Sequence, residues 1–139
     1  MKAGDCIHAS THADLLNQIL RKNYKAYMKS GYNLPDGKLI WMIALGPFIT
    51  PSGWINELVS IDRVSERHIG LDFDFQHNTY INSLTTGYYF SDADRVIFEV
   101  VKTRLGRKYI FRGVFRLNKE KSSINENVWD RVLDEYCFC

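Results

Sequence analysis

The chain has 139 residues, 45% of them hydrophobic and 14% aromatic, which is enough for one domain over residues 1–139 with a sizeable core. Lys and Arg outnumber Asp and Glu by only 18 to 16. This balance excludes a DNA mimic, because a mimic of the phosphate backbone needs a densely acidic surface. The longest apolar run, residues 39–45, falls far short of the ~20 residues that span a bilayer, so we expect a cytoplasmic protein with no membrane association.

A helix is predicted close to the N-terminus. Thr11 followed by Asp14 is typical of a helix start, and from Leu15 onward apolar residues recur at helical spacing until Gly31. The opposite face is basic and is expected to face water, with Arg21, Lys22, Lys25 and Lys29.

Turn signals then separate several predicted strands. Residues 35–37 (Pro-Asp-Gly) precede an apolar run over 38–45 that predicts a buried strand, and alternation over 67–75 predicts a half-buried one. Asn125 or Asn127 is placed to cap a final short helix, although a last strand is also compatible with the pattern. That helix would carry Val128, Trp129, Val132, Leu133 and Tyr136.

The stretch over residues 94–118 predicts a long two-stranded hairpin with one apolar and one basic face. Gly106 can supply the positive φ of a two-residue type II′ turn at 106–107. This register would place Phe98 opposite Phe115. Together with the N-terminal helix, it predicts an α+β fold: a small, strongly bent antiparallel sheet or barrel with an N-terminal amphipathic helix and a short C-terminal helix.

The predicted hairpin concentrates positive charge in a chain that is otherwise close to neutral. Its cations are Lys102, Arg104, Arg107, Lys108, Arg112 and Arg116. Cations contact phosphates while aromatic rings stack on bases, so the aromatic candidates are Trp54, Tyr88 and Tyr89. The alternative is an ordinary solvated hairpin in which Glu99 pairs with Arg112 and Arg116.

Two other groups of residues could bind a metal. Asp72 and Asp74 with Glu99 and Lys102 resemble the acidic set of a Mg²⁺-dependent nuclease, but Glu99 and Lys102 would point to opposite faces of a regular strand.

Cys6 and His8 could meet Cys137 and Cys139 in a zinc site if the chain ends lie close together. Their spacing is short for zinc, so free thiols are favoured. No phosphate-loop or dinucleotide fingerprint is present in the sequence, and no cofactor is expected.

The residues from Tyr88 to Asn118, in which D-A-D-R-V-I-F leads through a turn to Y-I-F-R-G-V-F-R-L, resemble the PUA-like β-barrels that include the EVE, ASCH and SRA modules. This resemblance implies binding of RNA or DNA. It also implies a pocket for a modified or flipped base, walled by Trp54, Tyr88 and Tyr89.

Three functions follow from these features. The first is a non-enzymatic nucleic-acid-binding protein that uses the basic hairpin for phosphates and aromatic loops for bases. The second is a protein-interaction module, such as a virus- or mobile-element-encoded inhibitor of a nucleic-acid-processing defence enzyme, because Tyr and Arg are also favoured at protein interfaces. The third is the Mg²⁺-dependent nuclease.

Overall fold

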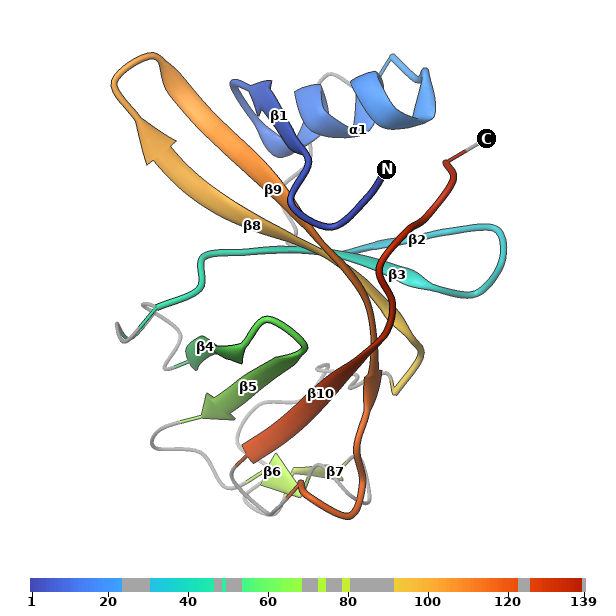
Figure 1. Cartoon of the computed structure of the whole chain (residues 1–139), viewed down its shortest axis with the longest axis vertical. Coiled ribbons are helices and arrows are strands. Elements are labelled where there is room, and N and C mark those ends of the chain that lie inside the picture. Colours follow the sequence, from blue (N-terminus) through green and yellow to red (C-terminus); the bar gives the residue numbers. More distant parts are fainter. Residues whose placement is uncertain are drawn as a thin grey trace. The chain divides into compact units, whose positions relative to one another are not determined.

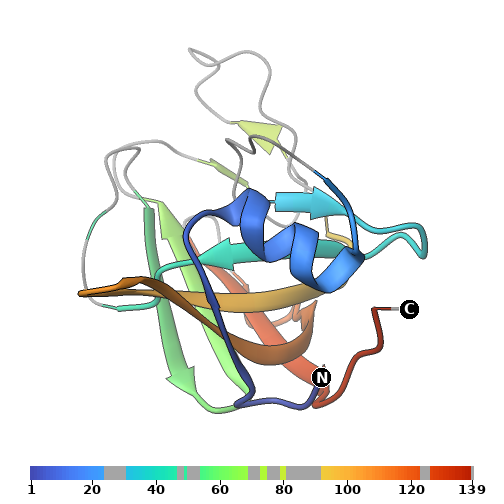
Figure 2. The ribbon, with the colours of Figure 1, turned by 90° about the horizontal axis from the view of Figure 1, so that it is seen from above.

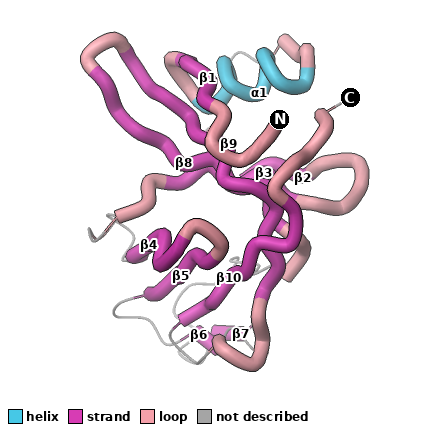
Figure 3. Tube along the Cα trace, viewed as in Figure 1, coloured by secondary structure: helices cyan, strands magenta, loops and turns pink. Residues whose placement is uncertain are grey.

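The computed structural model describes residues 1–23, 31–46, 49, 54–68, 73–74, 79–80, 92–122 and 126–138. Within these residues one short segment is helical and most of the regular structure is strand (Figure 3). No helix in the described part of the chain is long and apolar enough to cross a membrane.

The chain divides into two compact units. The first unit comprises Met1–Ala44, Asp94–Val114 and Val132–Cys139, and the second comprises Leu45–Ala93 and Phe115–Arg131. The first unit contains helix α1 (His12–Leu20) and strands β1 (Cys6–Ala9), β2 (Gly31–Asn33), β3 (Leu39–Ile43) and β8 (Arg95–Thr103). The second contains β4 (Trp54–Ser60), β5 (Arg63–His68), β6 (Phe73–Asp74) and β7 (Thr79–Tyr80). Strands β9 (Gly106–Leu117) and β10 (Glu126–Leu133) contribute residues to both units.

The predicted fold class is wrong. Eight strands form one open mixed sheet, with β2-β3-β8-β9-β10-β5-β4 as neighbours and β1 paired to β9, while β6 and β7 pair separately. The sheet is mixed because β3 and β8 run parallel, with Leu39 opposite Arg95. The antiparallel sheet or barrel, flanked by helices at both ends of the chain, is therefore replaced by a predominantly β structure.

The predicted C-terminal helix is strand β10. Asn127 and Trp129 lie opposite Glu66 and Val64 of β5, which supplies the hydrogen-bond partners that a short helix would have to find within itself. Val128 and Trp129 are β-branched and aromatic, and such residues fit a pleated, half-buried surface. A segment this short carries too few turns for helical periodicity to exclude a strand.

The N-terminal helix begins where the sequence predicts. The Oγ1 atom of Thr11 accepts a hydrogen bond from the Asp14 backbone N–H at 3.0 Å, a normal N-cap. The helix ends at Leu20, and Arg21 follows in the left-handed conformation with φ 53°. The predicted continuation over residues 24–30 lies outside the described part of the chain.

Helix α1 and four strands enclose the core of the first unit. Leu15 and Leu16 on α1 are fully buried, and Figure 1 shows α1 close to β1. The core also includes Ile40, Met42, Val96, Phe98, Tyr109 and Phe111. Helix α1 therefore packs on the apolar face of the hairpin.

The hairpin of β8 and β9 is present, but its turn lies earlier than predicted. Arg104 and Leu105 separate the two strands, and Gly106 follows the turn with φ 131° instead of opening it. As a result Phe98 packs against Phe111, with ring centroids 5.6 Å apart, and the predicted pairing of Phe98 with Phe115 is wrong.

Gly113 changes which side of β9 faces the core. Its φ is 117°, a conformation that L side chains rarely adopt. Tyr109 and Phe111 before it, and Val114 directly after it, all belong to the same core cluster. Strict alternation would place Val114 on the opposite face from Phe111, so the alternation along β9 breaks at this glycine.

The second unit contains a three-stranded antiparallel segment. Strands β4 and β5 lie side by side, as Figures 1 and 2 show, and β10 pairs with the other edge of β5. Because side chains alternate along a strand, Asn56, Glu66 and Asn127 share one face of this segment. All three side chains are buried.

Candidate nucleic-acid interface

The tip of the β8–β9 hairpin carries four of the predicted cations. Lys102 and Arg104 are exposed, whereas Arg107 and Lys108 at the start of β9 are half-buried. Leu105 stands among them in the turn and is completely exposed. The tip therefore presents positive charge and one apolar side chain to solvent.

Arg112 is engaged by Glu99 within the first unit. The guanidinium donates to Glu99 Oε1 from Nε at 2.9 Å and from Nη2 at 2.5 Å. Both side chains are largely buried, 24% exposed for Arg112 and 16% for Glu99. The predicted pairing of Glu99 with Arg112 is thus confirmed, although the pair is largely buried instead of solvated. Arg116 is an exposed residue of β9.

Replacing Glu99 by alanine is expected to lower the free energy of unfolding by about 1–3 kcal/mol, because the poorly solvated guanidinium of Arg112 loses two hydrogen bonds to this carboxylate. Urea denaturation measures the loss. The matched control is Lys119→Ala, whose partner is Asp92 at 3.1 Å in an exposed pair that should contribute less than about 1 kcal/mol. Equal losses in the two variants would contradict a structural role for the Glu99–Arg112 pair.

Three buried polar side chains form a row across β4, β5 and β10 of the second unit. This polar row consists of Asn56, Glu66 and Asn127, with Glu66 opposite both asparagines in the strand register. Their exposed fractions are 8%, 4% and 0%. Glu66 Oε1 accepts hydrogen bonds from Asn127 Nδ2 at 3.3 Å and from Trp129 Nε1 at 3.2 Å.

Two oxygen atoms of the polar row have no hydrogen-bond donor. Asn56 Oδ1 and Asn127 Oδ1 are both buried and unpartnered. Leaving a buried acceptor unsatisfied costs about 1–3 kcal/mol, so such groups need an explanation. The polar row therefore holds two buried acceptor oxygens without a donor, one on each side of Glu66 in the strand order.

Neighbouring polar groups on the same strands are paired. Ser65 donates to Glu126 at 2.6 Å, and Arg63 pairs with Asp130 at 2.7 Å. The Arg63 guanidinium lowers the pKa of the Asp130 carboxyl group. The unsatisfied oxygens of the polar row are therefore not typical of the polar side chains on these strands.

Trp54 is the one predicted aromatic whose position is described. It is the first residue of β4, half-buried, and two positions before Asn56, so it shares the face of the polar row. The sequence placed it in a loop and missed the polar row entirely. Alternation over residues 54–58 is the signal that could have indicated Asn56.

The other predicted site residues are less informative. Tyr88, Tyr89 and Asp72 lie outside the described part of the chain. Glu99 of the nuclease set is bound by Arg112, and among the described residues no group of three or more His, Cys, Asp or Glu could hold a metal ion. The described geometry therefore gives no support to a metal-dependent nuclease.

The cysteine predictions have a mixed outcome. Cys6 is free and exposed, as expected. Cys137 is disulfide-bonded, so the expectation of free thiols is wrong for this residue.

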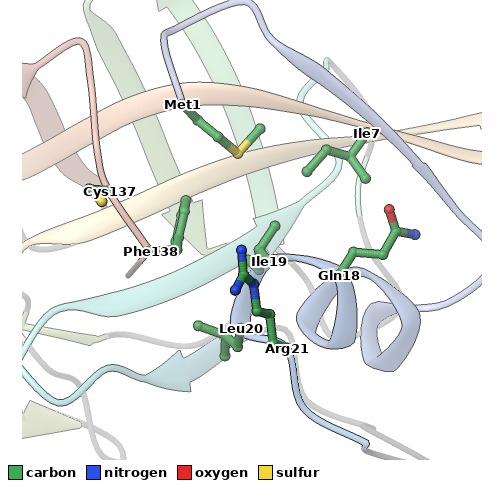
Figure 4. Close-up of a pocket in the computed structure, with 8 residues that line it drawn as sticks. All are labelled: Met1, Ile7, Gln18, Ile19, Leu20, Arg21, Cys137 and Phe138. Carbon is green, nitrogen blue, oxygen red and sulfur yellow. The ribbon is translucent and has the colours of Figure 1, made fainter.

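A separate cavity of about 680 Å³ lies in the first unit (Figure 4). Met1, Ile7, Ile19, Leu20 and Phe138 supply apolar surface, and Gln18 and Arg21 on or next to α1 supply polar groups. Among the residues predicted to bind nucleic acid, none of those that the structure describes lines this cavity. Its chemistry is that of a gap between α1 and the chain ends rather than of a surface for nucleic acid.

Comparison with known protein families shows which family this chain belongs to. The model of the SRA family, the SET and RING associated domain, matches residues 1–138. The chain belongs to the SRA family. The predicted resemblance to PUA-like domains is thereby confirmed, and the family match covers residues 1–138 instead of the hairpin region alone. SRA domains bind DNA, which supports a nucleic-acid partner.

A solved structure shares the fold. The 5-hydroxymethylcytosine-specific restriction enzyme AbaSI matches this SRA domain with a TM-score of 0.64 and 23% sequence identity. The match covers 96% of this chain but only 40% of the enzyme chain. A comparison with curated proteins gave no significant match.

Proposed function

We propose that this SRA domain binds DNA and holds one cytosine base, turned out of the duplex, against the polar row of Asn56, Glu66 and Asn127. Proteins that read an extruded base do so through hydrogen bonds to its Watson–Crick edge and through stacking. The amino group at N4 of cytosine is a donor that carboxyl groups accept. The observation that carries the proposal is the pair of buried, unpartnered oxygens beside Glu66.

The chemistry of the row favours a cytosine with a 5-hydroxymethyl group. This group adds one O–H donor next to the N4 amino group, so the modified base brings more donors to a site with two open acceptors. A base lacking such a donor leaves a buried acceptor unpaired, and sites of this kind reject such analogues strongly. The shared fold with a restriction enzyme specific for 5-hydroxymethylcytosine is consistent with this preference.

Trp54 and the basic hairpin have distinct roles in this proposal. A tryptophan on the face of the polar row can stack on the extruded base, and stacking is insensitive to sequence. Lys102, Arg104, Arg107 and Lys108 contact phosphates. Neither role requires bond breaking, so the proposed function is recognition without catalysis.

A titration over a range of salt concentrations tests the two roles together. Replacing Arg104, Arg107 and Lys108 by alanine should weaken binding to all DNA sequences alike. It should also reduce the slope of log K against log salt by about one for each phosphate that the variant no longer neutralises. Fluorescence anisotropy with duplexes that contain cytosine, 5-methylcytosine or 5-hydroxymethylcytosine measures both quantities.

Trp54→Ala is the matched control. It should lower affinity by about 1–3 kcal/mol for DNA with an extrudable base and leave the salt slope unchanged. The proposed function fails if the wild-type protein binds none of the three duplexes more tightly than ~100 μM at ~50 mM salt, where phosphate contacts are weakly screened.

A further inference from the structure

The cavity of about 680 Å³ in the first unit is walled by apolar side chains that the core leaves half-buried. Each of these side chains lines the cavity and also packs against the core cluster. They are Met1, Ile7, Ile19, Leu20 and Phe138. The core of the first unit therefore presents apolar surface to this cavity, and a ligand that covered the surface would remove it from water.

Separate segments of the first unit hold these walls in place. Ile7 lies on β1, which pairs with β9, and the last turn of α1 supplies two more wall residues. The ring of Phe138 contacts the buried rings of Phe98 and Phe111, with centroids 6.0 and 6.4 Å away. Because each wall is anchored independently, the cavity is formed before any ligand arrives.

Arg21 supplies the only charged side chain among the described residues that line the cavity. It follows the last residue of α1 with φ 53°, a conformation in which glycine is the usual residue. Within the described part of the chain its guanidinium forms no salt bridge and no side-chain hydrogen bond. Figure 4 shows the side chain directed toward the other lining residues. The cavity thus combines apolar walls with one positive group whose N–H donors are open.

We propose that this cavity binds an amphipathic carboxylate of the medium-chain fatty acid type, with its carboxylate paired to Arg21 and its apolar chain against the walls. A guanidinium fits a carboxylate with two parallel hydrogen bonds. Cavities of roughly 300–1,000 Å³ are typical of sites for small ligands.

The surroundings of Arg21 favour a ligand with a single negative charge. The carbonyl end of α1 next to Arg21 carries a partial negative charge, which disfavours a phosphate dianion. Apolar walls would also leave the remaining oxygens of a phosphate without donors. The site is independent of DNA binding and adds a second ligand to the proposed function.

Calorimetric titration of the whole chain at neutral pH tests the chemical class of the ligand. The probes are decanoate, decanol and decyltrimethylammonium, which share one apolar chain and differ in the charge of the head group. We expect decanoate to bind with a Kd of about 100 μM or tighter. Decanol should bind at least about tenfold more weakly, because it lacks the charge-assisted hydrogen bonds, and decyltrimethylammonium should not bind.

Arg21→Gln tests the residue that the proposal assigns to the carboxylate. It should weaken decanoate binding about tenfold or more and leave decanol binding unchanged. Lys22→Gln is the matched control, because it removes the same charge from the next residue, which is exposed and does not line the cavity. It should leave the affinity for both probes at the wild-type level.

Methyl NMR spectra locate the binding site without relying on affinity. Decanoate should shift the methyl resonances of Met1, Ile7, Ile19 and Leu20. Binding that leaves these resonances unmoved, or no binding tighter than ~1 mM, would overturn the proposed site. Equal affinities for decanoate and decanol, or wild-type decanoate binding in Arg21→Gln, would overturn the pairing of a carboxylate with Arg21. None of these outcomes bears on DNA recognition, since no DNA is present.

Discussion

Replacing Phe98 by alanine should lower the free energy of unfolding by about 3–5 kcal/mol, because it removes a fully buried ring from the core of the first unit. The ring of Phe98 lies 5.6 Å from that of Phe111 and 6.0 Å from that of Phe138. These neighbours are anchored on other segments and can collapse into the vacated space only in part. Urea denaturation followed by far-UV circular dichroism measures the change.

A double-mutant cycle tests the observed register as well as the burial. Phe98→Ala and Phe111→Ala should couple by about 0.5–1.5 kcal/mol, as expected for aromatic pairs in contact. Leu105→Ala is the matched control on the same hairpin, since its side chain is completely exposed, and it should change stability by less than about 0.5 kcal/mol. Additive effects at the two phenylalanines would show that their rings do not meet.

Replacing Glu66 by glutamine should weaken binding to 5-hydroxymethylcytosine DNA by about 1–3 kcal/mol, or roughly fivefold to more than a hundredfold in affinity. The substitution preserves the volume of the side chain but replaces one acceptor oxygen by an N–H₂ donor. That donor would face the donors of the extruded base or those of Asn127 and Trp129, which now meet Glu66 Oε1. Binding to a duplex without cytosine on either strand should be unchanged, because phosphate contacts carry no sequence information.

The matched control is Glu126→Gln on β10. Glu126 precedes Asn127 on the strand and accepts a hydrogen bond from Ser65, so it lies on the face opposite the polar row and its change should not affect discrimination between bases. Thermal denaturation of both variants shows whether the fold is intact. If folded Glu66→Gln protein still prefers 5-hydroxymethylcytosine DNA as strongly as the wild type, the polar row is not the base-binding site.

The sequence by itself determined the features that depend on neighbours a few residues apart. Thr11 and Asp14 predicted the start of α1, and alternating apolar residues predicted the long hairpin that became β8 and β9. The clustering of cations near Arg104 was visible without any structure, as was the resemblance to the PUA-like group. Each of these features depends on the spacing of residues that are close together in the sequence.

Only the tertiary structure decided which strands are neighbours and in what register. Residues 126–133 have only a weak intrinsic preference between helix and strand. They form strand β10 because β5 lies beside them and pairs with them. The observed hairpin turn differs in position from the predicted one, because Gly106 can adopt its positive φ after the turn as well as within it.

The polar row was beyond the reach of local patterns for the same reason. Asn127 lies 61 positions beyond Glu66 in the chain, and Asn56, Glu66 and Asn127 come together only because β5 pairs with β4 on one edge and with β10 on the other. The cost of two unpaired oxygens also exists only after folding, since water satisfies them in the unfolded chain. The sequence therefore determined the basic hairpin, whereas cross-strand pairing and burial decided where a base could be recognised.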